Sequence, residues 1–341
     1  WCQSKALGCP QFVRWGFASS RAYGKLAAEL KELSGIDTGY APTGGIIPCL
    51  GEAELEARAQ FIEKLRAETE DGTYPASVLS RKELEGMLPK VPFGPEVSGG
   101  IWSDMDGYVD PLHLMFAFRK SFVRLGGTLF AGERVSEVKP SGKGYTVVCG
   151  GRTLECGKAV LAAGLGVRKL AAQLGTDIPV FPNKSQVMLL ERIPADVLPI
   201  PLLGIARTFG GTVMIGAAHE NMGMDRRLTP EVLAANAQWA VRVWPELERK
   251  RILRFWTGLR VWPKDAYPIY DRIPGHENAF VFAMHSAVSL AAILEQALPD
   301  YVMGKPLPPD GAIFGLSRFA GGGSGFQGSA ASSPHAEAPN K

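Results

Sequence analysis

The stretch of sequence that most constrains the fold is a short apolar run near the middle of the chain. After Lys158, residues 159–163 are all apolar, and Gly164-Leu165-Gly166 then leads into a helical pattern that reaches Leu174. A strand that is apolar on both faces and is followed by a helix is typical of a parallel strand in an α/β sheet, because helices cover both sides of such a sheet. The run therefore predicts an α/β fold that contains parallel strands.

Helical and extended patterns alternate along the rest of the chain. Pro10 suits the first position of a helix, Gly35 its C-terminal cap, and Thr229 the N-cap of a later helix. Residues 86–103 carry no periodicity and are predicted as a loop that ends in a short strand. Helices are predicted over residues 10–34, 52–68, 112–125, 231–243 and 286–302, and strands over residues 44–48, 134–139, 145–149, 152–156, 187–190, 204–208, 212–216, 251–256 and 280–284. Because several of these strands are expected to be antiparallel, the architecture is a mixture of α/β and α+β.

Composition excludes several classes of protein. The net charge of +3 is too close to neutral to favour nucleic acid as a partner. No apolar run reaches the length of about 18 residues that a membrane span needs. The five cysteines form no C-x-x-C pair, so we expect neither a zinc site nor a disulfide framework. We expect the protein to work in a reducing compartment. The histidines stand singly, and they suggest no catalytic triad and no metal site.

The first candidate motif is Gly164-Leu165-Gly166, between the apolar strand and the helix. Glycines at such a turn let phosphate oxygens approach the backbone and the N-terminus of the helix. The third glycine of a dinucleotide loop is missing, because Lys169 stands in its place. The motif therefore predicts either a packing turn or a secondary contact to a cofactor, rather than a primary phosphate loop.

The second candidate motif is the segment 285–290, which lies between a predicted strand and the last predicted helix. His285 is followed by Ser286, Val288, Ser289 and Leu290 within this turn. A helix N-terminus directs several backbone N–H groups at one point, where an anion or an electron-rich ring edge is stabilised. The alternative is an ordinary serine N-cap beside a solvated histidine.

The third candidate motif places a single arginine, Arg260, among large apolar side chains. Trp256, Leu259 and Trp262 surround it in the sequence. A guanidinium in an apolar setting needs an anionic partner, and a bound carboxylate held by two hydrogen bonds is one candidate. The alternative is a structural ion pair with an aspartate of the chain, Asp265 or Asp271.

Together these motifs resemble the D-amino-acid oxidase-like FAD-dependent oxidoreductases, which include glycine oxidase, sarcosine oxidase and D-amino-acid dehydrogenases. The resemblance covers residues 1–319, and within the family it is similar to the flavoprotein subunits of hydrogen cyanide synthase and opine oxidase. It rests on an ordered set of segments: Gly107–Pro111, Glu133–Val138, Val160–Gly164, Gly211–Gly216 with Glu220 and Gly223, Gly258–Arg260 with Asp265 and Pro268-Ile269, and His285–Ala292. Ala287 and Ser289 depart conservatively from the subgroup's usual turn.

The resemblance implies a domain organisation and a set of site residues. A discontinuous FAD-binding domain is expected over residues 1–34, 104–175 and 258–319, a substrate domain over 35–103 and 176–257, and a disordered tail over 320–341. Arg260 is expected to bind the substrate carboxylate, and His285 with the following helix to steady the reduced flavin. Contacts to the cofactor are expected from Val135, Ala162, Ala163, Gly164, Gly258, Ser286, Val288, Ser289 and Leu290.

The function that the resemblance implies is oxidation of the C–N bond of a small amino acid or N-substituted amino acid, by hydride transfer to FAD. The resemblance is compatible with partner subunits of a heteromeric dehydrogenase. It is also compatible with a cytoplasmic location, either free or peripherally attached to the inner membrane. The family's opening βαβ unit, with its G-x-G-x-x-G pyrophosphate loop, is expected to lie outside a sequence that begins at Trp1, so the chain alone should bind FAD weakly. Two alternatives stay open, a non-catalytic scaffold subunit and a flavin-dependent 2-hydroxy acid dehydrogenase.

Overall fold

The computed structural model describes residues 8–69, 74–216 and 218–322. Its helices are α1 Pro10–Ser34, α2 Glu52–Glu68, α3 Arg81–Met87, α4 Pro111–Arg124, α5 Val167–Ala172, α6 Pro230–Val243, α7 Ala287–Val302 and α8 Pro309–Ala312, with 3₁₀ turns η2 Gly164–Gly166, η3 Pro245–Arg249 and η4 Leu316–Gly322. Its strands are β1 Gly45–Leu50, β2 Ser77–Ser80, β3 Val97–Ser103, β4 Val135–Ser141, β5 Gly144–Cys149, β6 Arg152–Cys156, β7 Ala159–Leu161, β8 Val180–Arg192, β9 Ile205–Arg207, β10 Thr212–Gly216, β11 Ile252–Pro263, β12 Ile269–Arg272 and β13 Ala279–Ala283.

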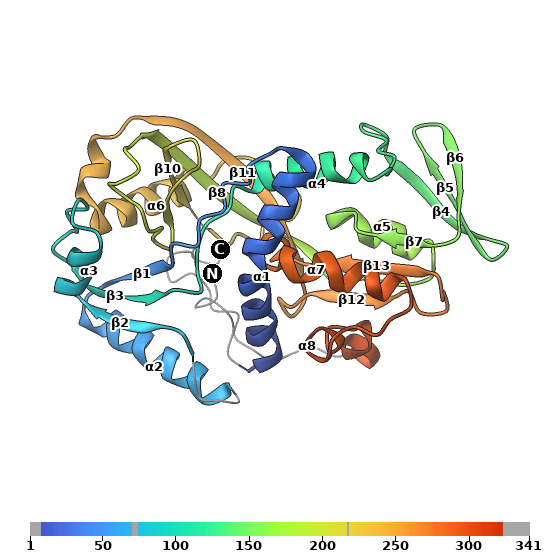
Figure 1. Ribbon diagram of the computed structural model, residues 1–341, viewed down its shortest axis with the longest axis horizontal. Coiled ribbons are helices and arrows are strands. Elements are labelled where there is room, and N and C mark those ends of the chain that lie inside the picture. The colour runs from blue at the N-terminus through green and yellow to red at the C-terminus, as the bar shows by residue number, and fades with distance from the viewer. Residues whose placement is uncertain (1–7, 70–73, 217, 323–341) are drawn as a thin grey trace.

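The apolar run after Lys158 forms a parallel strand, as predicted. Strand β7 pairs in parallel with β13, and β12 adds an antiparallel neighbour in the order β12-β13-β7. All five residues of β13 are buried. Helix α5 packs on this sheet together with the hairpin strands β4 and β5, and α7 covers it with α1 alongside (Figure 1).

A larger antiparallel layer occupies the other half of the molecule. Strands β11-β8-β10-β9 form one sheet and β1-β3-β2 another. Isolated bridges from Ile46 to Leu202 and from Leu202 to Ile205 connect the two. Helices α3 and α6 cover the layer, and Trp239 and Trp244, in α6 and just after it, are buried in the shared core.

The two halves are connected by a long ribbon made of β8 and β11. Their pairing runs from Val180 opposite Pro263 to Leu190 opposite Ile252. In Figure 1 this ribbon extends from the antiparallel layer toward the parallel sheet. Because side chains alternate between the two faces of a strand, each strand of the ribbon presents two separate sets of residues.

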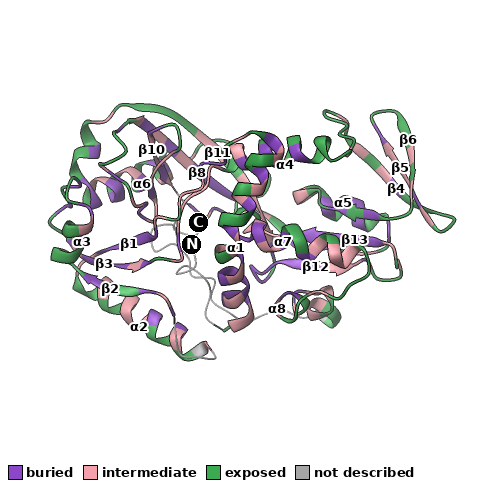
Figure 2. Ribbon diagram, viewed as in Figure 1, coloured by how far each residue is buried: buried purple, intermediate pink, exposed green. Residues whose placement is uncertain are grey.

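Helix α1 is defined by its two ends, as the sequence predicts. Pro10 occupies its first position, and Gly35 follows it in the left-handed conformation, with φ of 71°. A left-handed residue after the last turn is favourable for glycine, which has no Cβ. One face of α1 is buried against α4 and α7, whereas α4 carries a largely exposed outer face (Figure 2).

Three expectations about local structure are correct in place but wrong in extent or detail. Strand β8 begins at Val180 rather than at residue 187, because the polar run 183–186 finds partners on both faces of the ribbon. The predicted loop 86–103 begins within α3, whose N-terminus is closed by a capping box from Ser80, and the short strand predicted at its end is longer than expected, because β3 runs from Val97 to Ser103. Thr229 precedes α6 but makes no capping hydrogen bond with its side chain, because that hydroxyl is bonded elsewhere.

Most of the predicted tail, from residue 323 onward, lies outside the described residues, while Ala320–Gly322 belong to η4. The proposed domain boundaries stay a prediction. Within the described ranges, none of the helices combines the length and the apolar character required to cross a membrane.

Candidate active site

The fold brings the three candidate motifs together at one edge of the parallel sheet. Because β7 and β13 are parallel neighbours, the turns that follow them, at Gly164 and at His285, leave the sheet at the same edge. Strand β11 passes this edge. A Cβ atom at Gly164 would lie 3.5 Å from Val261, and the rings of Trp262 and His285 are stacked with centroids 4.4 Å apart.

Arg260 projects from β11 into a set of neutral partners. Its Nη1 donates to the carbonyl oxygen of Ala218 at 3.1 Å, and its Nη2 donates to Ser185 Oγ at 2.9 Å. Nη1 also lies 2.9 Å from Nδ1 and 3.2 Å from Nε2 of His219. Burial lowers the pKa of the guanidinium from its ordinary value, but an arginine stays charged at neutral pH.

The neighbouring imidazole of His219 is neutral. Burial, and then the charge of Arg260, lower its pKa from 6.5 to about 4. Its Nδ1 is 3.0 Å from the side-chain oxygen of Asn183, which can only accept. Asn183 in turn donates through Nδ2 to Asn221 Oδ1 at 3.2 Å. This pattern assigns the ring proton to Nδ1, and Nη1 of Arg260, which is close to both ring nitrogens, contacts the neutral ring rather than lying in line with either nitrogen.

The structural ion pair considered for Arg260 is not formed. Asp265 is bonded to Arg318, with Nε to Oδ2 at 2.7 Å. Asp271 accepts from the backbone N–H groups of Arg272 and Leu316. Within the ranges that the structure describes, Arg260 has no carboxylate partner, and its Nε–H and one Nη2–H remain available to an incoming anion.

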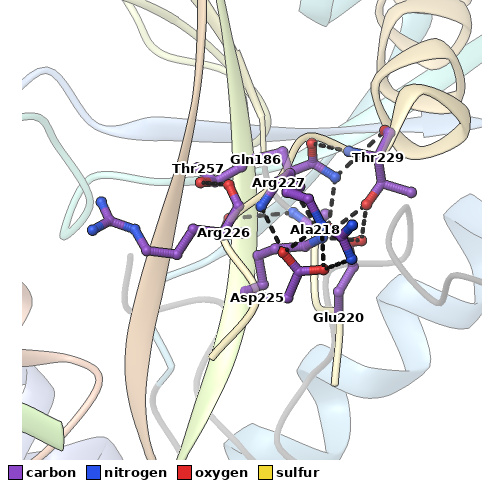
Figure 3. Close-up of polar contacts among 10 residues, drawn as sticks. Gln186, Ala218, Glu220, Asp225, Arg226, Arg227, Thr229 and Thr257 are labelled. Carbon is purple, nitrogen blue, oxygen red and sulfur yellow. Dashed lines mark hydrogen bonds and ion pairs between the residues drawn. The ribbon is translucent and has the colours of Figure 1, made fainter. Parts of the chain in front are cut away.

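A second polar cluster lies on the opposite face of β8. The ammonium of Lys184 is 3.1 Å from Glu220 Oε2 and donates to Thr229 Oγ1 at 2.8 Å, and to the carbonyl oxygen of Arg227 at 3.1 Å. Gln186 donates to Glu220 Oε1 at 2.6 Å, and Thr229 donates to Glu220 Oε2 at 2.7 Å. Figure 3 shows Gln186, Glu220 and Thr229 converging. The two buried charges of this cluster, on Lys184 and Glu220, therefore compensate each other, in contrast to the charge of Arg260.

The first turn of α7 is held from the side by α1. Ser19 Oγ donates to the carbonyl oxygen of Ser289 at 2.8 Å, and the hydroxyl of Tyr23 donates to the carbonyl oxygen of Val288 at 2.5 Å. Ser286 precedes the helix without a capping hydrogen bond from its side chain. The alternative of an ordinary serine N-cap is therefore wrong, and no side chain of Ser286 caps the first N–H groups of α7.

His285 is oriented by its neighbours on both ring nitrogens. Nε2 lies 2.7 Å from the carbonyl oxygen of Ala266, so it carries a proton, and Nδ1 lies 3.1 Å from Ser286 Oγ. Ala266 has φ of 64°, a left-handed conformation that costs a residue other than glycine energy. His285 is thus a fixed ring that stacks on Trp262, and its predicted effect on a reduced flavin stays a prediction.

The remaining predicted residues differ in how they are placed. Gly258 is exposed on the same face of β11 as Arg260, and a Cβ there would meet nothing within 4 Å. Ala162 and Ala163 are exposed beside Gly164. Leu290 is fully buried and its N–H is bonded to Ser286, so neither group faces outward.

Val135 begins β4 in the separate sheet β4-β5-β6, which lies away from β11 in Figure 1. It packs against the core of the parallel sheet and belongs to no contact around Arg260 in the described residues. Its predicted contact with the adenine stays a prediction.

Sequence reasoning missed the residues that hold Arg260, namely Asn183, Ser185 and His219. The available signal was the four-residue polar run 183–186 directly before an apolar strand. In a strand such a run places Asn183 and Ser185 on one face and Lys184 and Gln186 on the other. Which face would meet Arg260 depends on the pairing of β8 with β11, and the pairing cannot be inferred from the run itself.

Known proteins similar to this chain match it over nearly its whole length. A subunit of opine oxidase from Agrobacterium tumefaciens is 32% identical over 320 residues, which cover 94% of this chain and 85% of that protein. The hydrogen cyanide synthase protein HcnC of Pseudomonas aeruginosa is 28% identical, covering 91% and 75%. The crystal structure of glycine oxidase from Geobacillus kaustophilus superposes with a TM-score of 0.82 at 24% identity, covering 90% and 83%, and so shows the same fold.

The family model described as FAD dependent oxidoreductase (DAO) matches residues 7–294. That match spans both halves of the molecule, the ribbon between them and the turn that opens α7. It also confirms the family and the mixed architecture that the ordered motifs predict. The chain therefore belongs to the DAO family of FAD-dependent oxidoreductases.

Proposed function

We propose that this protein oxidises the C–N bond of a small amino acid or N-substituted amino acid, and that Arg260 binds the substrate's carboxylate. The observation that carries the proposal is the set of partners around Arg260. A partly buried guanidinium is held by a hydroxyl, a carbonyl oxygen and a neutral imidazole, while two of its donors have no partner in the described part of the chain. A carboxylate supplies the missing charge and can accept both hydrogen bonds.

The residues around the edge of the sheet fit a flavin. Gly258 leaves open space on the Arg260 face of β11, where a side chain would otherwise stand. The N–H groups at the start of α7 have no side-chain cap, and Gly164 turns the chain with φ of 58°. Flat open backbone, free N–H donors and a tight glycine turn suit an aromatic ring system with an electron-rich edge.

Bound FAD supplies the hydride acceptor of such a reaction. The chain's own contribution is positioning. Arg260 holds the carboxylate, and Trp262, between His219 and His285, forms an aromatic wall beside it. No protein base is needed when the substrate amine is neutral, so orientation and fixed charge carry the rate.

The proposal is tested by replacing Arg260 in the FAD-loaded enzyme and measuring kcat/KM. Substrates are glycine, sarcosine and iminodiacetate, with glycolate as the matched 2-hydroxy acid. Loss of a charge-assisted pair worth about 1.5–3 kcal/mol predicts a decrease of about ten- to a hundredfold for Arg260→Ala, with partial rescue by Arg260→Lys.

Arg254→Ala is the matched control, because Arg254 lies exposed on the same strand. Its activity should equal that of the unaltered protein. Turnover that survives in Arg260→Ala, with a lower melting temperature only, would remove Arg260 from the active site. Faster turnover of glycolate than of every amine would favour the 2-hydroxy acid alternative.

We also propose that the protein works in a multi-subunit enzyme. The support is that two relatives, the opine oxidase protein of Agrobacterium tumefaciens and HcnC, are named as subunits of larger enzymes. Size-exclusion chromatography of the protein purified from its own host tests this, with elution as a monomer as the contrary result.

A further inference from the structure

The contact between Arg260 and His219 is the feature of the site that carries a further inference. Resting on the function proposed above, we propose that His219 is a positioning residue, whose neutral ring packs against Nη1 of Arg260 and sets the orientation of the guanidinium toward the substrate. Arg260 has five N–H donors on a rigid plane, so fixing some of them fixes the direction of the others.

Three neutral groups lie against the Nη1 and Nη2 end of the guanidinium. Ser185 Oγ and the carbonyl oxygen of Ala218 take one donor each, at 2.9 Å and 3.1 Å. The ring of His219 lies against Nη1, with Nδ1 at 2.9 Å and Nε2 at 3.2 Å. Replacing any of these groups with a carboxylate would neutralise Arg260 and compete with the substrate, whereas a neutral acceptor orients the guanidinium and leaves its charge for the substrate.

The imidazole is in turn fixed on its other side. Asn183 accepts the proton of Nδ1, which fixes the neutral ring in place beside Nη1 of Arg260. The ring of Trp262 stands edge-on to His219 at a centroid distance of 5.2 Å. The charged and titratable groups packed around His219 are Arg260 on β11, the paired Lys184 and Glu220 behind β8, and His285 beyond Trp262.

The backbone of His219 is anchored by the residue that follows it. Glu220 and Lys184 exchange two backbone hydrogen bonds, at 2.9 Å and 3.0 Å, and their side chains form the buried ion pair. Because neighbouring residues on an extended segment point to opposite faces, burial of Glu220 behind β8 directs His219 to the Arg260 face. The segment that carries His219 and Glu220 is thus held by both polar clusters, with His219 beside Arg260 and Glu220 paired with Lys184.

The first test follows the imidazole by NMR and needs neither flavin nor substrate. In the unaltered chain at pH 7 we expect a neutral His219 with its proton on Nδ1. In Arg260→Met the pKa of His219 should rise from about 4 toward its ordinary value, because the neighbouring charge is gone. A proton on Nε2 at pH 7, or an unchanged pKa in Arg260→Met, would overturn the proposal.

The second test measures affinity for acetate, a carboxylate without an amine, by titration of the purified protein. His219→Leu should weaken acetate binding about tenfold, whereas His219→Gln, which keeps a neutral polar group beside Arg260, should restore most of it. His276→Gln is the matched control, since His276 lies by Tyr145, away from the ribbon. In the FAD-loaded enzyme the loss in His219→Leu should appear mainly in KM.

The outcomes separate this inference from the proposed function. If Arg260→Met abolishes acetate binding and His219→Leu does not change it, the function stands and the positioning role is wrong. If acetate binds equally well to Arg260→Met and to the unaltered chain, the carboxylate role of Arg260 is wrong, and the NMR result alone then decides whether His219 orients the guanidinium.

Discussion

Replacing Lys184 with methionine would leave the carboxylate of Glu220 buried without its cation. The side chains of Lys184 and Glu220 are only 1% and 5% exposed, and their charged atoms lie 3.1 Å apart. Methionine matches the length of lysine closely, so the change removes charge and hydrogen bonds rather than volume. Gln186 and Thr229 would still donate to the carboxylate.

The expected cost is large because water cannot reach the remaining charge. Removing one partner of a buried ion pair destabilises a protein by about 3–5 kcal/mol. Because Gln186 and Thr229 still donate to Glu220, the cost here should lie near the lower limit. Lys184→Met combined with Glu220→Gln removes both charges. The double variant should therefore lose less free energy of unfolding than the sum of the single variants, with a coupling of about 1–3 kcal/mol.

Native-state hydrogen exchange is the assay, because the amides of residues 184 and 220 bond to each other's carbonyl groups. A loss of about 3 kcal/mol corresponds to a decrease in their protection of about a hundredfold. Lys305→Met is the matched control, since the Lys305–Asp300 pair is exposed and should contribute less than about 1 kcal/mol. A change below about 1 kcal/mol in Lys184→Met, equal to that of the control, would refute the reasoning.

Other consequences can be checked with the same protein. His219 stays neutral in the folded state down to a pKa of about 4, whereas the unfolded chain takes up a proton near pH 6.5, so its contribution to stability falls as the pH decreases from about 6.5 to 4. His219→Gln should make the melting temperature less sensitive to pH over that window, and an identical profile would contradict the assignment. Gly258→Ala should fold normally but weaken FAD binding in a flavin titration, because its Cβ meets no protein atom, and unchanged affinity would place the ring elsewhere. Gly164→Ala should cost about 1–2 kcal/mol of stability from its positive φ alone, measured by urea unfolding, and a much larger loss would show a steric clash.

Patterns local in sequence are sufficient for most of the secondary structure. The ends of α1 follow from Pro10 and Gly35, and the hairpin of β5 and β6 from Gly150-Gly151, because turns and caps depend on a few neighbouring residues. The parallel strand β7 follows from its apolar run. Local patterns do not predict an element whose stability depends on residues far away in the sequence. The polar start of β8 is not predicted as strand because its residues are stabilised by partners more than 30 positions away.

The ordered motifs also identify the family, since each motif depends on local residue types and the family preserves their order. The alternatives for Arg260 cannot be resolved in this way. Whether Arg260 meets Asp265, Asp271 or neither depends on which side chains the ribbon turns toward it. In the structure Arg318, 53 positions further on, takes Asp265, and the backbone takes Asp271.

The sequence by itself therefore determined the class of fold, the family and the three segments that form the site. Only the tertiary structure decided what surrounds Arg260. The register between β8 and β11 places Asn183 opposite Arg260 and Lys184 on the other face, and a shift of one residue would exchange the neutral cluster with the ion-paired one. Register is a long-range property, set by burial on both faces of the sheet, and the residues on either strand do not specify it alone.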